Sequence, residues 1–265
     1  MKNKTSLTKD AILKDPYNYT LKEMKDCLGE EMATDFFESL YKNKPKIQNQ
    51  TVKIKEVFNG KDTLKYAFEL SDGYCIETVC IKRKTGITVC VSTMVGCPVG
   101  CIFCASGKNG FIRNLSSSEI VQQIVLLKEK VNRIVFMGMG EPLLNYGEVI
   151  KAIHILRDRD GLNFPTDGIT ISTVGPINQL KKLREEHLKI QLTLSLHATS
   201  QVKRDKVMPH MRGNSIDDVV EAVLSYSERH NRKVTIAYLL IPGFNDGRED
   251  IKQLKKWFFG KNVLI

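Results

Sequence analysis

The stretch that decides the fold is residues 86–137, which read GITVCVSTMVGCPVGCIFCASGKNGFIRNLSSSEIVQQIVLLKEKVNRIVFM. Ile87–Ser92 predicts a strand. Ser116 and Glu119 then have the spacing of a capping box, which begins a helix. A second strand is predicted at Arg133–Met137. The helix between the strands presents an apolar stripe at helical spacing, made of Ile120, Ile124, Leu127 and Val131. The stretch is therefore one strand–helix–strand unit.

The same alternation continues to the last residue of the sequence. Repeated units of this kind require a parallel sheet with right-handed crossovers, and six successive strands favour a curved, partial barrel over a doubly wound sheet. We therefore expect an α/β fold, a partial (β/α)6 barrel over residues 86–265 that ends at the sixth strand. The further strands are predicted at Ile169–Thr173, Ile190–Leu196, Lys233–Leu240 and Asn262–Ile265, and the further helices at Val149–Leu156, Ile177–Arg184, Asp217–His230 and Arg248–Phe259.

Residues 1–85 have a different pattern. A stretch rich in Lys and Glu, Leu21–Tyr41, predicts helix, and alternating segments at Thr63–Leu70 and Cys75–Ile81 predict strands. We expect a small α+β extension at residues 1–85 that packs against the barrel, with a soft boundary near residue 85.

Composition and charge narrow the class of protein. With 265 residues, 42% hydrophobic and 26% charged, the chain has the composition of a soluble globular protein. It has no apolar run of the roughly 18 residues that a membrane-spanning helix needs, and its charged start lacks the apolar core of a secretory signal. This predicts a cytoplasmic protein with no membrane partner. The absence of coiled-coil heptads predicts a monomer.

The chain is strongly basic, with a formal net charge of +10 and a pI of about 9.2. Such a charge attracts polyanions, and nucleic acid is the first candidate. Because the basic residues are spread along the chain, a solvated basic surface is the alternative interpretation.

The strongest chemical signal is a loop with three cysteines, Cys97, Cys101 and Cys104, which directly follows the first predicted barrel strand. Thiolates hold iron–sulfur clusters, and three ligands on a [4Fe–4S] cluster leave one iron open for an external ligand. Zinc is the alternative. It would require a fourth ligand, which His197 or Cys90 could supply, and would close the site.

Polar residues follow the ends of the next three predicted strands, where ligands bind in such barrels. Gly140 and Glu141 follow the second barrel strand, and Glu141 could offer a carboxylate to a cation. Each residue alone has an ordinary structural explanation, but together around one mouth they suggest a ligand site. The remaining residues of this group are Ser172 and Thr173 at the end of the third strand, and Ser195 and His197, with Leu196 between them, at the end of the fourth. Asp158–Gly161 lacks the full spacing of a calcium loop and is interpreted as a turn.

The cysteine spacing, with Phe103 before its last cysteine, resembles the radical S-adenosylmethionine (SAM) superfamily. The wider pattern resembles one branch, the RlmN/Cfr family of ribosomal RNA adenine methyltransferases, over about residues 65–265. It is carried by residues 90–124, FMGMGEPLLN at 136–145, ISTVG at 171–175, LSLHA at 194–198 and RKVTIAYLLIPGFND at 232–246.

The resemblance implies that Cys97, Cys101 and Cys104 hold a [4Fe–4S] cluster whose open iron is chelated by SAM, and that an external donor reduces it. It also implies that the substrate is ribosomal or transfer RNA, methylated on an adenine by way of a 5′-deoxyadenosyl radical. Two residues match the family's catalytic positions: Glu77 would take the adenine proton and Cys90 would resolve a protein–RNA adduct. The SAM contacts would be Gly140, Glu141, Ser172, Ser195, Leu196 and His197.

The sequence departs from the family in two respects. Its N-terminal extension is short for the RNA-binding domain that the family carries, and the second departure lies after the sixth strand. The family continues beyond the sixth strand to a cysteine that carries the methyl group, whereas no cysteine follows Cys104 here. We therefore expect cluster and SAM binding, but not methyl transfer by the family route. A fragment, a gene truncation or a diverged enzyme would each fit. The alternatives are a radical SAM protein with another substrate and a zinc-stabilised nucleic-acid-binding module.

Overall fold

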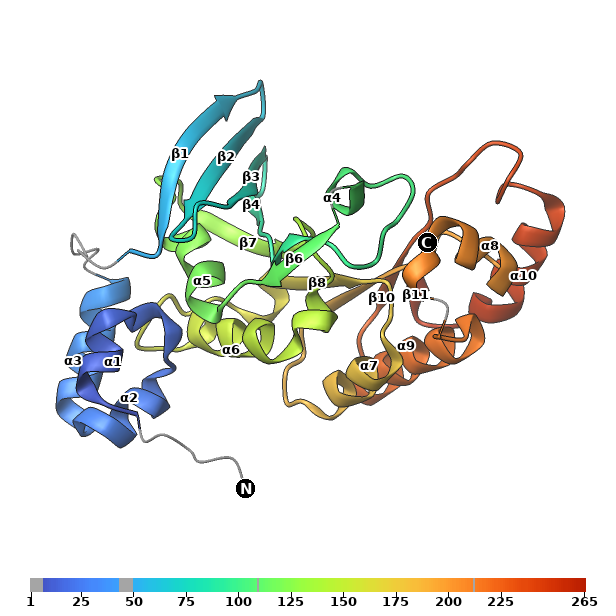
Figure 1. Cartoon of the computed structure of the whole chain (residues 1–265). Helices are drawn as coiled ribbons and strands as arrows, with labels where there is room; N and C mark the ends of the chain where they lie inside the picture. Colours follow the sequence, from blue (N-terminus) through green and yellow to red (C-terminus); the bar gives the residue numbers. More distant parts are fainter. Residues whose placement is uncertain (1–6, 43–49, 109, 212) are drawn as a thin grey trace. The chain divides into compact units, whose positions relative to one another are not determined.

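The structure of the chain is a computed structural model that describes residues 7–42, 50–108, 110–211 and 213–265 (Figure 1). The chain divides into two compact units, which are described separately. The first comprises the chain up to Ser92 together with Asn114–Ile134 and Gly147–Pro165, and the second comprises Thr93–Arg113, Val135–Tyr146 and Thr166–Ile265. The predicted domain boundary at residue 85 stays a prediction.

Short helices begin the first unit. They are α1 (Lys9–Lys14), the 3-10 helix η1 (Pro16–Asn18), α2 (Leu21–Leu28) and α3 (Glu30–Tyr41). The predicted helical stretch is thus interrupted at Gly29, which has φ of +86° and ends α2. Glycine adopts this backbone conformation without the steric penalty that other residues meet.

An antiparallel sheet forms the rest of the N-terminal part. Its strands are β1 (Val52–Asn59), β2 (Thr63–Leu70), β3 (Cys75–Arg83) and β4 (Gly86–Cys90), each paired antiparallel with the next, and β7 (Val131–Phe136) follows β4 in the strand order. The two predicted strands here, β2 and β3, are present. The residues of β1 were not predicted as a strand. Seven of its eight residues are exposed, and its alternation of apolar and polar residues is interrupted by the register shift between Ile54 and Glu56.

Helix α5 (Ser117–Val125) begins with the predicted capping box of Ser116 and Glu119. Its buried glutamines bind backbone of the sheet. The Gln122 side-chain oxygen accepts hydrogen bonds from the amides of Thr51 and Val52, and Gln123 exchanges two hydrogen bonds with the backbone of Ser92. Buried amides of this kind are costly unless they have partners. Helix α6 (Tyr146–Arg157) also contributes to this unit.

The second unit contains the parallel strands β8 (Ile169–Thr173), β9 (Gln191–Ser195), β10 (Val234–Ala237) and β11 (Val263–Leu264), which are neighbours in this order. Between them run α7 (Ile177–Glu185), α8 (Gln201–Val207), α9 (Ile216–His230) and α10 (Arg248–Phe258), and α7 packs against α9 (Figure 1). The prediction of an α/β fold with parallel strands is confirmed. The 3-10 helices are η2 (Pro142–Asn145), η3 (Thr166–Gly168) and η4 (Pro209–Met211), and a small ribbon consists of β5 (Met94–Gly96) and β6 (Phe111–Asn114), with α4 (Ala105–Lys108) between its strands.

Two local predictions have clear outcomes. The predicted strand to Leu240 ends at Ala237, because the backbone beyond it bonds to side chains: the amides of Leu239 and Ile241 donate to His197 and Asn245. Asp158–Gly161 is a turn, as predicted, closed by the amide of Gly161 on the carbonyl of Asp158. None of the helices in the described part of the chain has both the length and the apolar character needed to cross a bilayer.

Candidate functional site

The three cysteines lie on the loop that joins β5 to α4, in the second unit. All three are half-buried. The loop is closed by backbone bonds: the Cys97 amide donates to Gly110, and the Cys104 amide donates to the Cys101 carbonyl at 3.0 Å. The cysteine spacing thus places three cysteines on one short loop.

Helix α8 and η4 support this loop. The Ile102 amide donates to the Val207 carbonyl at 3.1 Å, and a ring nitrogen of His210 lies 2.8 Å from the Pro98 carbonyl oxygen. Gly100 has φ of +66°, and a side chain there would reach within 2.9 Å of the His210 ring. Position 100 therefore needs glycine both for its backbone and for this close approach.

Burial and neighbouring charges shift the pKa values of Cys97 and Cys101. Burial raises the pKa of Cys101 to about 12, and the nearby sulfurs of Cys97 and Cys104 and the carboxylate of Glu141 raise it too. Burial also raises the pKa of Cys97, although the amides of Val99 and Gly100 partly oppose this by hydrogen bonding to its sulfur. Within the described ranges, no three His, Cys, Asp or Glu residues are arranged to hold a single metal ion.

Glu141 follows β7 and is fully buried, 3% exposed. Its carboxylate accepts hydrogen bonds from the amides of Leu143 and Val174, at 3.0 and 2.8 Å, and from the Thr173 hydroxyl at 2.6 Å. Burial raises the pKa of Glu141 to about 7, and these hydrogen bonds oppose the rise. The side chain therefore pins the end of β8 to the segment after β7.

Gly140 precedes this carboxylate. Its φ is +103°, and a side chain there would lie 2.7 Å from Met94 and from the Thr93 hydroxyl. The amides of Thr93 and Met94 both donate to the carbonyl of Met139. Close packing of these two segments thus explains the glycine.

The predicted residues at the ends of β8 and β9 do come together. The hydroxyls of Ser172 and Ser195 lie 3.2 Å apart. Leu196 is fully buried, and its amide donates to the carbonyl of Ala237 at 3.0 Å. The two hydroxyls form a pair that can donate to one ligand.

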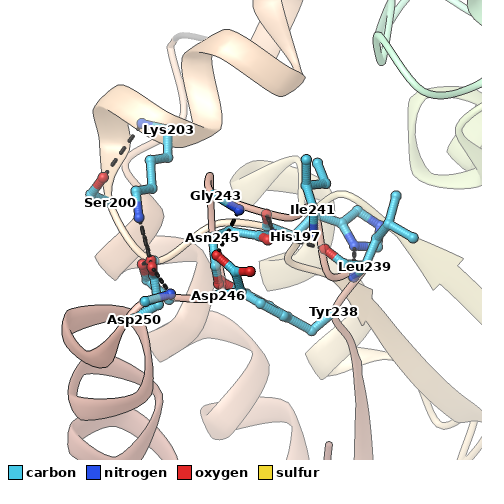
Figure 2. A network of polar contacts seen from close by, with 12 residues as sticks. His197, Ser200, Lys203, Tyr238, Leu239, Ile241, Gly243, Asn245, Asp246 and Asp250 are labelled. Carbon is cyan, nitrogen blue, oxygen red and sulfur yellow. Dashed lines mark hydrogen bonds and ion pairs between the residues drawn. The ribbon is translucent and has the colours of Figure 1, made fainter.

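His197 follows β9 with φ of +51° (Figure 2). Its Nδ1 accepts a hydrogen bond from the Leu239 amide at 2.9 Å, which leaves Nε2 to carry the proton of the neutral ring. Burial, together with the charge of Arg204, lowers the pKa of His197 to about 4. The Phe103 ring meets the imidazole edge-on, with centroids 5.0 Å apart. His197 is therefore a neutral hydrogen-bond donor beside the cysteine loop.

The sequence analysis did not predict two residues of the site, Asn245 and Arg204. Asn245, 1% exposed, donates from Nδ2 to the carbonyls of His197 and Leu239 and accepts from the Ile241 amide (Figure 2). The glycine and asparagine of PGFND mark a turn and could have indicated such a residue. Arg204, 0% exposed, lies in a run of charged residues that gave no signal of burial.

Glu77 and Cys90 lie on β3 and β4 of the first unit. In that ladder Val79 pairs with Cys90, so Glu77, two residues from Val79, shares a sheet face with Cys90. The Ser92 hydroxyl donates to the Glu77 carbonyl at 2.6 Å. The Glu77 side chain is 53% exposed, and its carboxylate pairs with the Lys65 ammonium at 2.8 Å. The two side chains are thus diagonal neighbours on one face.

Comparison with known proteins matches residues 91–257 to the model of the radical SAM superfamily. A probable RNA methyltransferase of Rhodopseudomonas palustris is 56% identical over 74% of this chain and 54% of its own length. A probable dual-specificity RNA methyltransferase RlmN of Pseudothermotoga lettingae is 45% identical over 83% of this chain and 65% of its own length. The chain therefore spans between about half and two thirds of these relatives.

A solved structure agrees with these matches. The crystal structure of a radical SAM methyltransferase from Sphaerobacter thermophilus superimposes with a TM-score of 0.87 and 30% identity, over 93% of this chain and 82% of that one. This is consistent with a partial, unclosed barrel. On its matched residues and the arrangement of its strands, the chain belongs to the radical SAM superfamily and resembles its RlmN/Cfr-type members.

Proposed function

We propose that the chain binds a [4Fe–4S] cluster and SAM in its second unit and acts in radical methylation of an adenine in ribosomal or transfer RNA. The observation that carries the proposal is the ordered loop of Cys97, Cys101 and Cys104 in a unit of the radical SAM superfamily. When bound, the reduced cluster would supply the electron that cleaves SAM to a 5′-deoxyadenosyl radical. An external donor would provide that electron.

The donor set fits a cluster. Three thiolates on one loop can each take a different iron of a cubane and leave the fourth open. The amides of Val99 and Gly100 hydrogen bond to the Cys97 sulfur, and such contacts stabilise a thiolate ligand. Hydrogen bonds to Val207 and from His210 hold the loop in place.

The residues proposed for SAM fit a ligand that is both polar and charged. The paired hydroxyls of Ser172 and Ser195 can donate to its hydroxyl or carboxylate oxygens. His197 offers Nε2–H as a further donor. Gly140 and Glu141 would contribute backbone groups, because the Glu141 carboxylate already accepts three hydrogen bonds from the chain. The Leu196 amide already donates to Ala237, so a polar contact from Leu196 would come from its carbonyl, which also accepts from Ala198.

RNA is proposed as the substrate on two grounds. Relatives are named as RNA methyltransferases, and the net charge of +10 favours a polyanion. Glu77 is proposed as the base that takes the adenine proton and Cys90 as the thiol that resolves an adduct. Their position on one sheet face, in adjacent strands, supports a joint role.

The test is an anaerobic reaction of the reconstituted chain with SAM, dithionite and ribosomal or transfer RNA. Iron and sulfide are measured first, and 5′-deoxyadenosine and methyladenosine are then measured by mass spectrometry. Cys101→Ala should lose the iron, whereas Cys75→Ser, an exposed cysteine elsewhere, should keep it. Both products would support the proposal and would mean that a thiol other than one after Cys104 carries the methyl group. Deoxyadenosine alone would support cluster and SAM binding but not RNA methylation by this chain, and stoichiometric zinc without iron would refute the proposal.

A further inference from the structure

Arg204 is a fully buried cation whose hydrogen bonds are incomplete. It lies in α8, is 0% exposed, and donates from Nη2 to the carbonyl of Val174. Among the described residues, Nε and Nη1 have no hydrogen-bond partner. A buried guanidinium without such partners is strongly unfavourable, because the charge has lost its water and gained little in return.

The acidic groups near Arg204 do not fill this gap. Burial lowers the pKa of Arg204, while the charges of Asp205, Cys101 and Glu141 raise it. These groups are therefore close enough to act on the guanidinium, yet none accepts a hydrogen bond from Nε or Nη1. Glu141 instead accepts from Leu143 and Val174 amides and from Thr173, and Asp205 accepts from Gln201 at 2.7 Å.

Helix α8, which carries Arg204, contacts the cysteine loop. Val207, one helical turn further along α8, accepts the hydrogen bond from Ile102 of that loop. On the other side, Val174 accepts from Arg204 through its carbonyl and donates to Glu141 through its amide. The guanidinium is thus bonded to the end of β8, and its own helix contacts the cysteine loop through the carbonyl of Val207. The charge of Cys101 acts on it as well.

We infer that Arg204 is an anion-binding residue of the cofactor site, whose Nε and Nη1 donate to a negatively charged group that arrives with the cofactors. This inference rests on the proposed cluster and SAM site, but not on RNA as the substrate. The anion is either a sulfur of the cluster or the carboxylate of SAM. Both accept charge-assisted hydrogen bonds of the kind that a guanidinium favours.

The test uses the full chain with Arg204→Gln, which can still donate to Val174 but has no charge, and Arg204→Lys, which keeps the charge. Arg184→Gln removes one charge from the surface of the same unit, where Arg184 bonds to Glu185 and Ser225. Thermal unfolding of each apoprotein is compared with that of the reconstituted protein. Iron and sulfide content, the midpoint potential of the cluster and SAM affinity by anaerobic calorimetry follow.

The inference predicts opposite effects in the two states. Arg204→Gln should leave the apoprotein at least as stable as wild type, because an unpaired buried charge is gone, and should reduce the stabilisation gained on reconstitution or SAM binding. A more negative midpoint potential without SAM would identify the cluster as the anion. An unchanged potential with SAM binding weakened about tenfold or more would identify the carboxylate. Arg204→Lys should lie between Arg204→Gln and wild type.

Two results would overturn the inference alone. The first is that wild type takes up the cluster, while Arg204→Gln has the same cluster content, midpoint potential and SAM affinity as the control Arg184→Gln. The other is unfolding of both Arg204 apoproteins, because the guanidinium would then serve the fold itself. A wild-type chain that takes up no iron and sulfide would overturn the proposed function, and this inference with it.

Discussion

Replacing Asn245 with alanine should destabilise the second unit by about 3 kcal/mol. The side chain is 1% exposed and makes three hydrogen bonds: to the carbonyls of His197 and Leu239 at 2.9 and 2.7 Å, and from the Ile241 amide at 2.7 Å (Figure 2). At about 1 kcal/mol net for each bond, their loss gives this figure. It is a large part of the stability of a typical domain, about 5–15 kcal/mol.

The assay is urea unfolding followed by the fluorescence of Trp257, the single tryptophan of the chain, which lies in the same unit. With m of about 3 kcal/mol/M, the midpoint should fall by about 1 M. Asn178→Ala, an exposed asparagine on α7, is the control and should leave the midpoint nearly unchanged. A loss below about 1 kcal/mol for Asn245→Ala would refute the reasoning, because it would mean that water or a rearranged loop replaces all three bonds.

The other predictions concern packing and pH. Gly140→Ala should lower the free energy of unfolding by about 2 kcal/mol or more, because φ is +103° and the new methyl would meet Met94 and Thr93 at 2.7 Å. Gly147 in α6 has open space around it, so Gly147→Ala should raise the free energy of unfolding by up to about 1 kcal/mol. Circular dichroism in urea distinguishes them, and equal effects would contradict the packing argument. Burial raises the pKa of Asp250, but hydrogen bonds from Lys203 and Thr199 outweigh it and leave the pKa below its ordinary value. The stabilising contribution of Asp250 is therefore complete above about pH 4 and is lost as pH falls through the lower folded pKa. Asp250→Asn should flatten the acid side of the apoprotein's curve of stability against pH. An unaltered curve would count against this reasoning.

Much of the architecture could be predicted from the sequence, because the spacing of apolar residues indicates which face of a helix or strand is buried. The strand Ile169–Thr173 agrees residue for residue, and the capping box at Ser116 marks the start of α5. Short or largely exposed elements were harder to predict. The edge strand β1 and the short, charged helix α8 were missed. Leu239 and Leu240, which are apolar but exposed, extended a predicted strand beyond its true end.

The candidate site shows the same division. Cysteine spacing is a local property, so the sequence predicted the loop. The burial of Arg204 and the bond from Asn245 to His197 depend on segments distant in sequence, and both residue types are common on surfaces. The role of the Glu141 carboxylate also depends on Thr173 and Val174, more than thirty residues away, which no local pattern reveals.

Strand β1 is an edge strand of the sheet in the first unit. Several features of its outer edge disfavour pairing with a strand from another molecule. The amides of Thr51 and Val52 donate to the Gln122 side-chain oxygen, so they are not free to pair with another strand. The register of the β1–β2 pairing shifts between Ile54 and Glu56. The Lys65 ammonium lies over the exposed Phe58 ring, 4.9 Å from its centroid. Irregular, charged edges of this kind resist strand-to-strand aggregation. At the high concentrations used for anaerobic reconstitution, this edge should help the chain to stay in solution.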